Sequence, residues 1–127
     1  MLLRYFKKHF KLNAAELRKY KNMATRAHLI IKDKDGDERF IYHHWDGYPE
    51  GVGKEVREFL HLEEVANIFN AQEFCKAIEK WDCSYEFEDT GLHGDEDYIY
   101  EIDLDKRTYR CYNVSRKPKT LEFNETF

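Results

Sequence analysis

Residues 25–45 read TRAHLIIKDKDGDERFIYHHW, and this stretch decides the fold. Two runs of β-branched, aromatic and other apolar residues flank the dipeptide Asp35-Gly36. An Asp-Gly pair between two such runs is a strong signal for the turn of a β-hairpin. We therefore predict two antiparallel strands, one over residues 25–32 and the other over residues 38–45.

The rest of the chain continues with helices and then returns to strands. An apolar stripe at helical spacing predicts a helix over residues 52–60, a shorter helical segment follows, and Asn70 with Glu73 forms a capping box for the next helix. Alternating apolar and polar residues then predict an antiparallel meander and one edge strand, at residues 84–88, 97–104, 108–114 and 120–123. The order ββ-ααα-βββ predicts an α+β fold, in which an antiparallel sheet of about five strands has its helices packed on one face.

Charge divides the chain into a basic start and an acidic remainder. Residues 1–32 carry nine Lys or Arg against Glu16 alone, a net charge of +8, and residues 33–127 hold 12 Lys or Arg and 24 Asp or Glu, a net charge of −12. We predict a basic, helical N-terminal extension over residues 1–22 and a single α+β domain over residues 23–127. The extension can contact nucleic acid, an anionic membrane or an acidic partner, or fold back onto its own domain.

The composition excludes several classes of protein. The three cysteines are an odd number without CxxC spacing, which argues against a secreted disulfide scaffold and against a thiolate zinc site. Charged residues interrupt the apolar start of the chain, and no stretch reaches the length of a membrane span. The acidic loop at residues 93–97 lacks calcium-loop spacing and is predicted to be a solvated turn. We therefore predict a soluble cytoplasmic protein that binds no membrane and needs no cofactor.

Residues 42–54, YHHWDGYPEGVGK, hold the densest group of reactive and conformationally special residues. Three glycines and a proline specify a tight bend before the next helix, whose first N–H groups would face the bend and favour an anion. A Walker A phosphate loop does not fit, because five residues separate Gly47 from Gly53 and Glu55 stands where the Mg²⁺-binding hydroxyl belongs. The candidate binding residues are His44, Trp45, Asp46, Gly47, Tyr48, Gly51, Gly53 and Lys54.

Two chemical interpretations of this segment stand beside a purely structural one. His43 and His44 are neighbours in a strand, so they point to opposite faces and cannot hold one metal ion together. A metal site would need His44, Asp46 and a distant histidine such as His93, and because no metal-binding spacing supports it we assign no metal. General acid–base chemistry could use His44 with Asp46, or Asp46 with Tyr48. In the structural interpretation, Asp46 caps the turn.

The run HWDGYPEGVG at residues 44–53 resembles the hallmark of a family of small bacterial and bacteriophage proteins. Members carry an H-[WFY]-D-G-Y-P-x-G-V-G segment after a β-hairpin. The resemblance begins near residues 23–27 and continues more weakly into residues 94–102. It implies a protein encoded by a prokaryote or a phage, which acts in the cytoplasm of a bacterium or an infected host cell. The family brings no established activity, so the resemblance assigns no catalytic roles.

These observations favour a non-enzymatic binding protein, an accessory factor of phage or mobile-element type that acts on a host factor by protein–protein interaction. Its acidic domain could mimic nucleic acid and inhibit a host defence nuclease, and a second copy of the chain is another candidate partner. The alternative is a small hydrolase or nucleotide-binding enzyme that uses the turn at His44, Asp46 and Tyr48. Nucleic-acid binding through the basic arm is disfavoured, although a helix there would align Arg4, Lys7, Lys8 and Lys11.

Overall fold

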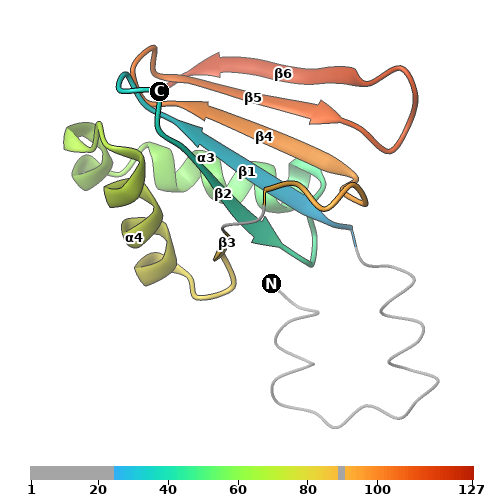
Figure 1. Cartoon of the computed structure of the whole chain (residues 1–127), viewed down its shortest axis with the longest axis horizontal. Coiled ribbons are helices and arrows are strands. Elements are labelled where there is room, and N and C mark those ends of the chain that lie inside the picture. Colours follow the sequence, from blue (N-terminus) through green and yellow to red (C-terminus); the bar gives the residue numbers. More distant parts are fainter. Residues whose placement is uncertain (1–24, 89–90) are drawn as a thin grey trace, which may run out of the picture.

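The computed structural model of the chain describes residues 25–88 and 91–127 (Figure 1). The predicted helical extension over residues 1–22 lies outside the described residues. Six strands form one sheet in the order β3-β2-β1-β4-β5-β6. The strands are β1 Ala27–Lys32, β2 Glu38–His43, β3 Glu86–Glu88, β4 Tyr98–Asp103, β5 Thr108–Asn113 and β6 Thr120–Thr126.

The helical segments lie between β2 and β3. They are the π-helical turn η1 Pro49–Gly53, α3 Lys54–Leu60, the 3₁₀ turn η2 Glu63–Asn67 and α4 Ala71–Trp81. The predicted cap of α4 is confirmed, because Asn70 Oδ1 accepts a hydrogen bond from the Glu73 N–H at 3.0 Å. The shorter predicted helix is only a 3₁₀ turn, so the described part of the chain has two α-helices rather than three. Within residues 25–88 and 91–127, no helix has the length and apolar character needed to cross a membrane.

The α+β class is confirmed, whereas the strand pairing differs from the prediction. Instead of about five antiparallel strands ending in a meander, the structure has a mixed sheet of six, with the predicted edge strand β6 in place. β1 pairs antiparallel with β2 and parallel with β4, while β3 pairs with β2 rather than with β4. The reason lies in β1, whose residues from Ala27 to Ile31 are all buried. A strand buried on both faces is central, so β1 needs a neighbour on each side.

Both α-helices pack on the same face of the sheet, as predicted, and Figure 1 shows α3 behind β1 and β2. Inward side chains of β1, β2, β4 and β5 form one core with the helices. The apolar stripe that predicts the helix at residues 52–60 is buried in this core, namely Val52, Val56, Phe59 and Leu60. The opposite face of the sheet carries His28 and Tyr42 beside apolar residues such as Ile30 and Phe40, and a loop crosses it.

That loop joins β3 to β4 and crosses the second face of the sheet, here called the open face. β3 lies beyond β2, and β4 lies on the far side of β1, so residues 91–97 pass over both strands (Figure 1). The ring of His93 lies on this face, 4.7 Å from the ring of His28 and 4.6 Å from the ring of Tyr42. The crossing thus brings the predicted solvated turn onto a strand at the centre of the sheet.

Asp33 connects the β1–β2 hairpin to α4. Its Oδ2 accepts a hydrogen bond from the Ala71 N–H at 2.9 Å, and its Oδ1 accepts hydrogen bonds from the N–H groups of Asp35 at 3.0 Å and Asp37 at 3.1 Å. The bond from Ala71 is the strongest of the influences that hold the pKa of Asp33 below its ordinary value, and burial acts in the opposite direction. One buried carboxylate therefore serves both the hairpin turn and the first turn of a helix.

Candidate functional site

The predicted turn between β2 and α3 is closed by its own backbone. Asp46 has a left-handed conformation with φ of 53°, which aspartate adopts more readily than most residues. The carbonyl of Asp46 accepts a hydrogen bond from the Val52 N–H at 2.8 Å, and the Gly51 N–H donates to the Tyr48 carbonyl at 2.9 Å. A Cβ atom at Gly51 would lie 2.2 Å from the Asp46 oxygen, so the closure requires glycine at this position.

The closure changes the expectation of an anion site at the start of the helix. At the start of a helix, backbone N–H groups can bind an anion. Here the N–H groups of Gly51, Val52, Gly53 and Lys54 donate to carbonyls within the turn instead. An anion would have to compete with these hydrogen bonds. The accessible chemistry of the segment therefore lies in its side chains.

Two buried tyrosines of the sheet fasten the turn to the core. The Tyr100 hydroxyl donates to the Gly47 carbonyl at 2.6 Å, and the Tyr109 hydroxyl donates to the Gly53 carbonyl at 3.0 Å. The Gly47 N–H donates to the Thr25 carbonyl at 2.9 Å. Both glycines are buried. Gly47 and Gly53 are thus placed as backbone anchors, so among the predicted binding residues they act by positioning the turn.

Tyr100→Phe is expected to lower the free energy of unfolding by about 1–3 kcal/mol, because the Gly47 carbonyl would stay buried without its donor. Tyr98→Phe is the matched control: Tyr98 lies on the same strand but is partly exposed, and its loss should stay within about 0.5 kcal/mol. Urea denaturation followed by fluorescence measures both variants. Equal losses would show that the Tyr100 hydroxyl does not hold the turn.

The other six predicted residues line two open hollows on either side of the turn. His44 and Trp45 line a hollow of about 430 Å³, together with residues of β2 and of the segment that leads into β3. The second hollow, of about 310 Å³, lies beside α3 and is lined by Asp46, Tyr48, Gly51 and Lys54. The turn therefore presents its side chains in two directions.

The hollow beside α3 is acidic. Its charged lining residues are Asp46, Glu50, Glu55, Glu58 and Lys54. The Tyr48 hydroxyl donates to Asp46 Oδ1 at 3.1 Å, and burial, followed by this hydrogen bond, raises the pKa of the Tyr48 hydroxyl. Tyr48 is 38% exposed, which leaves a neutral aromatic ring next to several carboxylates.

Of the two pairs considered for acid–base chemistry, His44 and Asp46 do not converge, whereas Asp46 and Tyr48 are hydrogen-bonded to each other. Nδ1 of His44 lies 2.7 Å from the Tyr42 hydroxyl on the open face, and burial raises the pKa of that hydroxyl. Asp46 instead pairs with Tyr48 beside α3. Because His44 and Asp46 line different hollows, a single bound molecule in one hollow would not meet both side chains.

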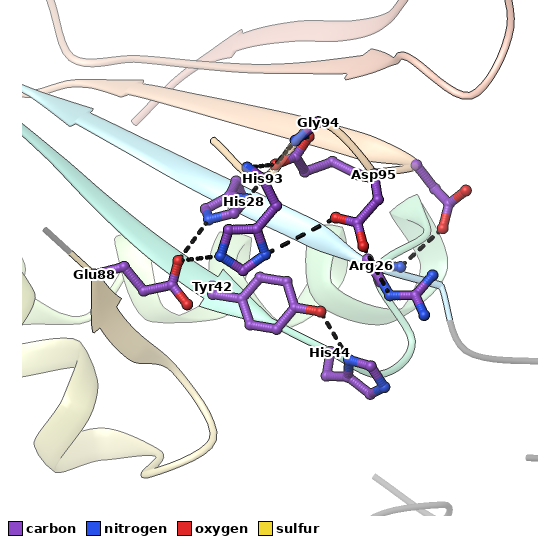
Figure 2. A network of polar contacts seen from close by, with 10 residues as sticks. Arg26, His28, Tyr42, His44, Glu88, His93, Gly94 and Asp95 are labelled. Carbon is purple, nitrogen blue, oxygen red and sulfur yellow. Dashed lines mark hydrogen bonds and ion pairs between the residues drawn. The ribbon is translucent and has the colours of Figure 1, made fainter. Parts of the chain in front are cut away.

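A second group of polar side chains lies where residues 91–97 cross the open face (Figure 2). Glu88 Oε2, at the end of β3, lies 3.2 Å from His28 Nε2 and 2.5 Å from His93 Nε2. Figure 2 shows both imidazole rings turned toward this carboxylate. The His28 side chain is fully buried at the centre of the sheet, whereas the side chains of His93 and Glu88 are 34% and 20% exposed.

Another carboxylate faces the second nitrogen of His28. Glu96 Oε1 lies 2.9 Å from His28 Nδ1, although the two groups are not aligned as a hydrogen bond. Glu96 is buried and accepts hydrogen bonds from the backbone N–H groups of His93 and Gly94. Burial acts to raise the pKa of Glu96, but hydrogen bonds from these N–H groups and its own hold it below the ordinary value. A buried imidazole thus lies between two carboxylates.

His28 and Glu88 do not stand out in the sequence, whereas His93 appears there as a distant partner for His44, and His93 and Glu96 belong to the acidic loop predicted to be a solvated turn. These residues come from three segments that only the crossing loop brings together. One signal was available: His28 interrupts the apolar run at residues 27–31, and a polar side chain in a buried strand needs partners.

Comparison of this chain with protein families, with curated proteins and with solved structures finds no match. The fold and the two polar regions define a small α+β domain with a closed, glycine-dependent turn and a histidine–carboxylate group on its open face. The family resemblance of residues 44–53 stays a prediction.

Proposed function

We propose that this protein is a non-enzymatic binding protein of phage or mobile-element type, which acts on a host factor by protein–protein interaction. The observation that carries the proposal is the acidic hollow beside Tyr48, which is built from the segment that the sequence singles out. Protein-binding surfaces commonly combine aromatic anchors with a polar rim. Tyr48 supplies the aromatic ring of this hollow, and the carboxylates supply the rim.

The expected partner is a host protein with clustered Lys or Arg side chains. Such a surface would complement the carboxylates of the hollow, and the net charge of −12 over residues 33–127 would speed its encounter with the domain. The same charge repels nucleic acid. The nucleic-acid cleft of a host defence nuclease has the required basic character, and an acidic protein seated in it would act as an inhibitor.

Replacing two exposed carboxylates of the hollow, with Glu50→Lys and Glu58→Lys together, is expected to reduce capture of the partner roughly tenfold or more. The control is Glu63→Lys with Glu64→Lys, which makes the same change of charge at exposed positions of η2 outside the hollow. The tagged full-length proteins are used to pull down partners from bacterial lysate, and captured proteins are quantified by mass spectrometry. Equal losses in both double variants, or no specific partner for the wild type, would contradict the proposal.

The alternative, a small hydrolase or nucleotide-binding enzyme at His44, Asp46 and Tyr48, is tested with the same proteins. A thermal-shift screen of nucleotides and cyclic oligonucleotides would reveal it, because a ligand at a hundred times its Kd stabilises a protein by about 2.7 kcal/mol. Stabilisation that is lost in both His44→Ala and Asp46→Ala would favour the enzyme. Since these residues line different hollows, we expect no such ligand.

A further inference from the structure

We propose that His28, Glu88 and His93 form a binding site for a divalent transition-metal ion, with Zn²⁺ the best match. One possible ligand atom from each residue lies within 4.8 Å of the other two. The residues come from β1, from the end of β3 and from the loop that crosses the open face. This site goes beyond the proposed partner binding, and it replaces the expectation, drawn from sequence spacing alone, that the chain binds no metal.

The distances between the three side chains suit a small tetrahedral ion. Bonds of about 2.1 Å from zinc to nitrogen or oxygen place neighbouring ligand atoms about 3.4 Å apart. His28 Nε2 and Glu88 Oε2 are already 3.2 Å apart. Glu88 Oε2 and His93 Nε2, at 2.5 Å, would have to separate by about 1 Å. Both side chains are partly exposed and can rotate, while the sheet holds His28 in place.

The two carboxylates on either side of the His28 ring favour a cation next to it. A neutral imidazole has one N–H and one lone pair, so it can donate to only one carboxylate. Glu88 faces Nε2 of His28 and Glu96 faces Nδ1, so a neutral ring would direct its lone pair at one of the two. A cation on Nε2 removes this repulsion and leaves the Nδ1 proton for Glu96. A metal ion in that position would also bind His93, which a proton on His28 cannot do.

Glu96 occupies the place of a residue that supports a metal ligand. Histidines that bind metals commonly direct their second ring nitrogen to a carboxylate, which fixes the tautomer and the orientation of the ring. Glu96 is itself fixed, because it is buried and held by the backbone N–H groups of His93 and Gly94. A carboxylate is therefore held 2.9 Å from the second ring nitrogen of the most buried of the three ligands.

The donor set decides the class of metal. Two imidazoles and one carboxylate suit Zn²⁺ and its first-row neighbours, whereas Mg²⁺ and Ca²⁺ prefer oxygen ligands alone. Three protein ligands leave a fourth tetrahedral position, which water or a group from a partner could fill. We expect Zn²⁺ and Co²⁺ to bind and Mg²⁺ to leave the site empty.

Isothermal titration of the full-length chain with Zn²⁺ tests the site. We expect one saturable site that depends on these side chains. Glu96→Gln should lower the affinity about 10–100-fold, as expected for a supporting residue, and Glu88→Gln and His93→Ala, which remove ligands, should lower it further. His61→Ala is the matched control, since His61 is exposed at the end of α3, and it should leave the affinity unchanged.

A second measurement identifies the ligands directly. Co²⁺ in a tetrahedral site absorbs visible light much more strongly than octahedral Co²⁺, so the wild type should gain this absorption and His93→Ala should not. Because His28 is fully buried, the variants alter the other residues, and circular dichroism verifies that each one is folded. The proposal is overturned if the wild type shows no saturable binding of Zn²⁺, or if folded Glu88→Gln and His93→Ala bind it as tightly as the wild type.

Discussion

Gly51→Ala is expected to destabilise the domain by about 3–5 kcal/mol, a large part of the stability of a typical small domain. The added Cβ atom would lie 2.2 Å from the Asp46 carbonyl oxygen and 3.0 Å from the Asp46 Cβ. Backbone must therefore move, and the hydrogen bond from the Val52 N–H to the same oxygen would be lost. Thermal unfolding followed by circular dichroism should show a fall in Tm of more than about 10 °C.

Gly53→Ala, two residues further along, is the control for this prediction. Gly53 already has helical angles, with φ of −54° and ψ of −47°, and an added Cβ would lie 3.4 Å from the ring and the hydroxyl of Tyr100 and 3.6 Å from the Phe123 ring. We expect a change within about 1 kcal/mol in either direction, because alanine favours the helix while the contact is close. If both variants lose the same stability, the close approach at Gly51 is not what specifies the turn.

Asp33→Asn is expected to lower the free energy of unfolding by about 2–4 kcal/mol, although the two side chains have nearly the same shape. Both oxygens of Asp33 accept backbone N–H groups, Oδ2 from Ala71 and Oδ1 from Asp35 and Asp37. An asparagine side chain has one oxygen, so its NH₂ group would face either the buried N–H of Ala71 or the N–H groups of Asp35 and Asp37. Asp35→Asn, at an exposed position of the same hairpin, should change stability by less than about 0.5 kcal/mol.

The cost of Asp33→Asn should also depend on pH. The pKa of Asp33 is lower in the folded chain than its ordinary value of 3.8, so its carboxylate stabilises the fold fully above that value. As pH falls below about 4, the unfolded chain takes up this proton first, and the advantage of the wild type shrinks. Chemical denaturation of both proteins between neutral pH and pH about 3 measures the difference. A difference that stays constant would exclude this contribution.

Elements with local signals could be predicted from the sequence. The turn at Asp35-Gly36 predicts the hairpin because the residues that form it are adjacent, and Gly36 has the positive φ of 81° that such a turn uses. Asn70 predicts the start of α4 for the same reason, since the cap and the capped N–H group are three residues apart. The predicted tight bend at residues 46–53 agrees with Gly47 and Gly51, where a Cβ atom would approach backbone too closely, whereas Gly53 has helical angles that other residues can adopt.

The pairing of the strands could not be predicted in the same way. The sequence places the strand at residues 97–104 beside the one at 84–88, because neighbours in sequence usually pair. In the structure the two are separated by β2 and β1. β1 lies between β2 and β4 because both of its faces are buried. That burial depends on tertiary contacts, which the alternation of residues along a strand does not reveal.

The candidate sites could be predicted only where their residues are adjacent in the sequence. The turn at residues 44–54 is continuous in sequence, so its residues could be singled out, but the direction of each side chain could not. His28, Glu88 and His93 come from three separate segments, and their proximity follows from the crossing of the open face. No spacing along the chain encodes that crossing.

The position of β1 also bears on how the chain is made. During synthesis β1 leaves the ribosome before its parallel neighbour β4, which follows only after α3 and α4. Until β4 emerges, one edge of the apolar strand β1 has no hydrogen-bonding partner. An unpaired edge of this kind favours binding to chaperones or self-association. We therefore expect the domain to complete its folding only after β4 has left the ribosome, and nascent chains stalled before residue 98 to aggregate where the finished protein does not.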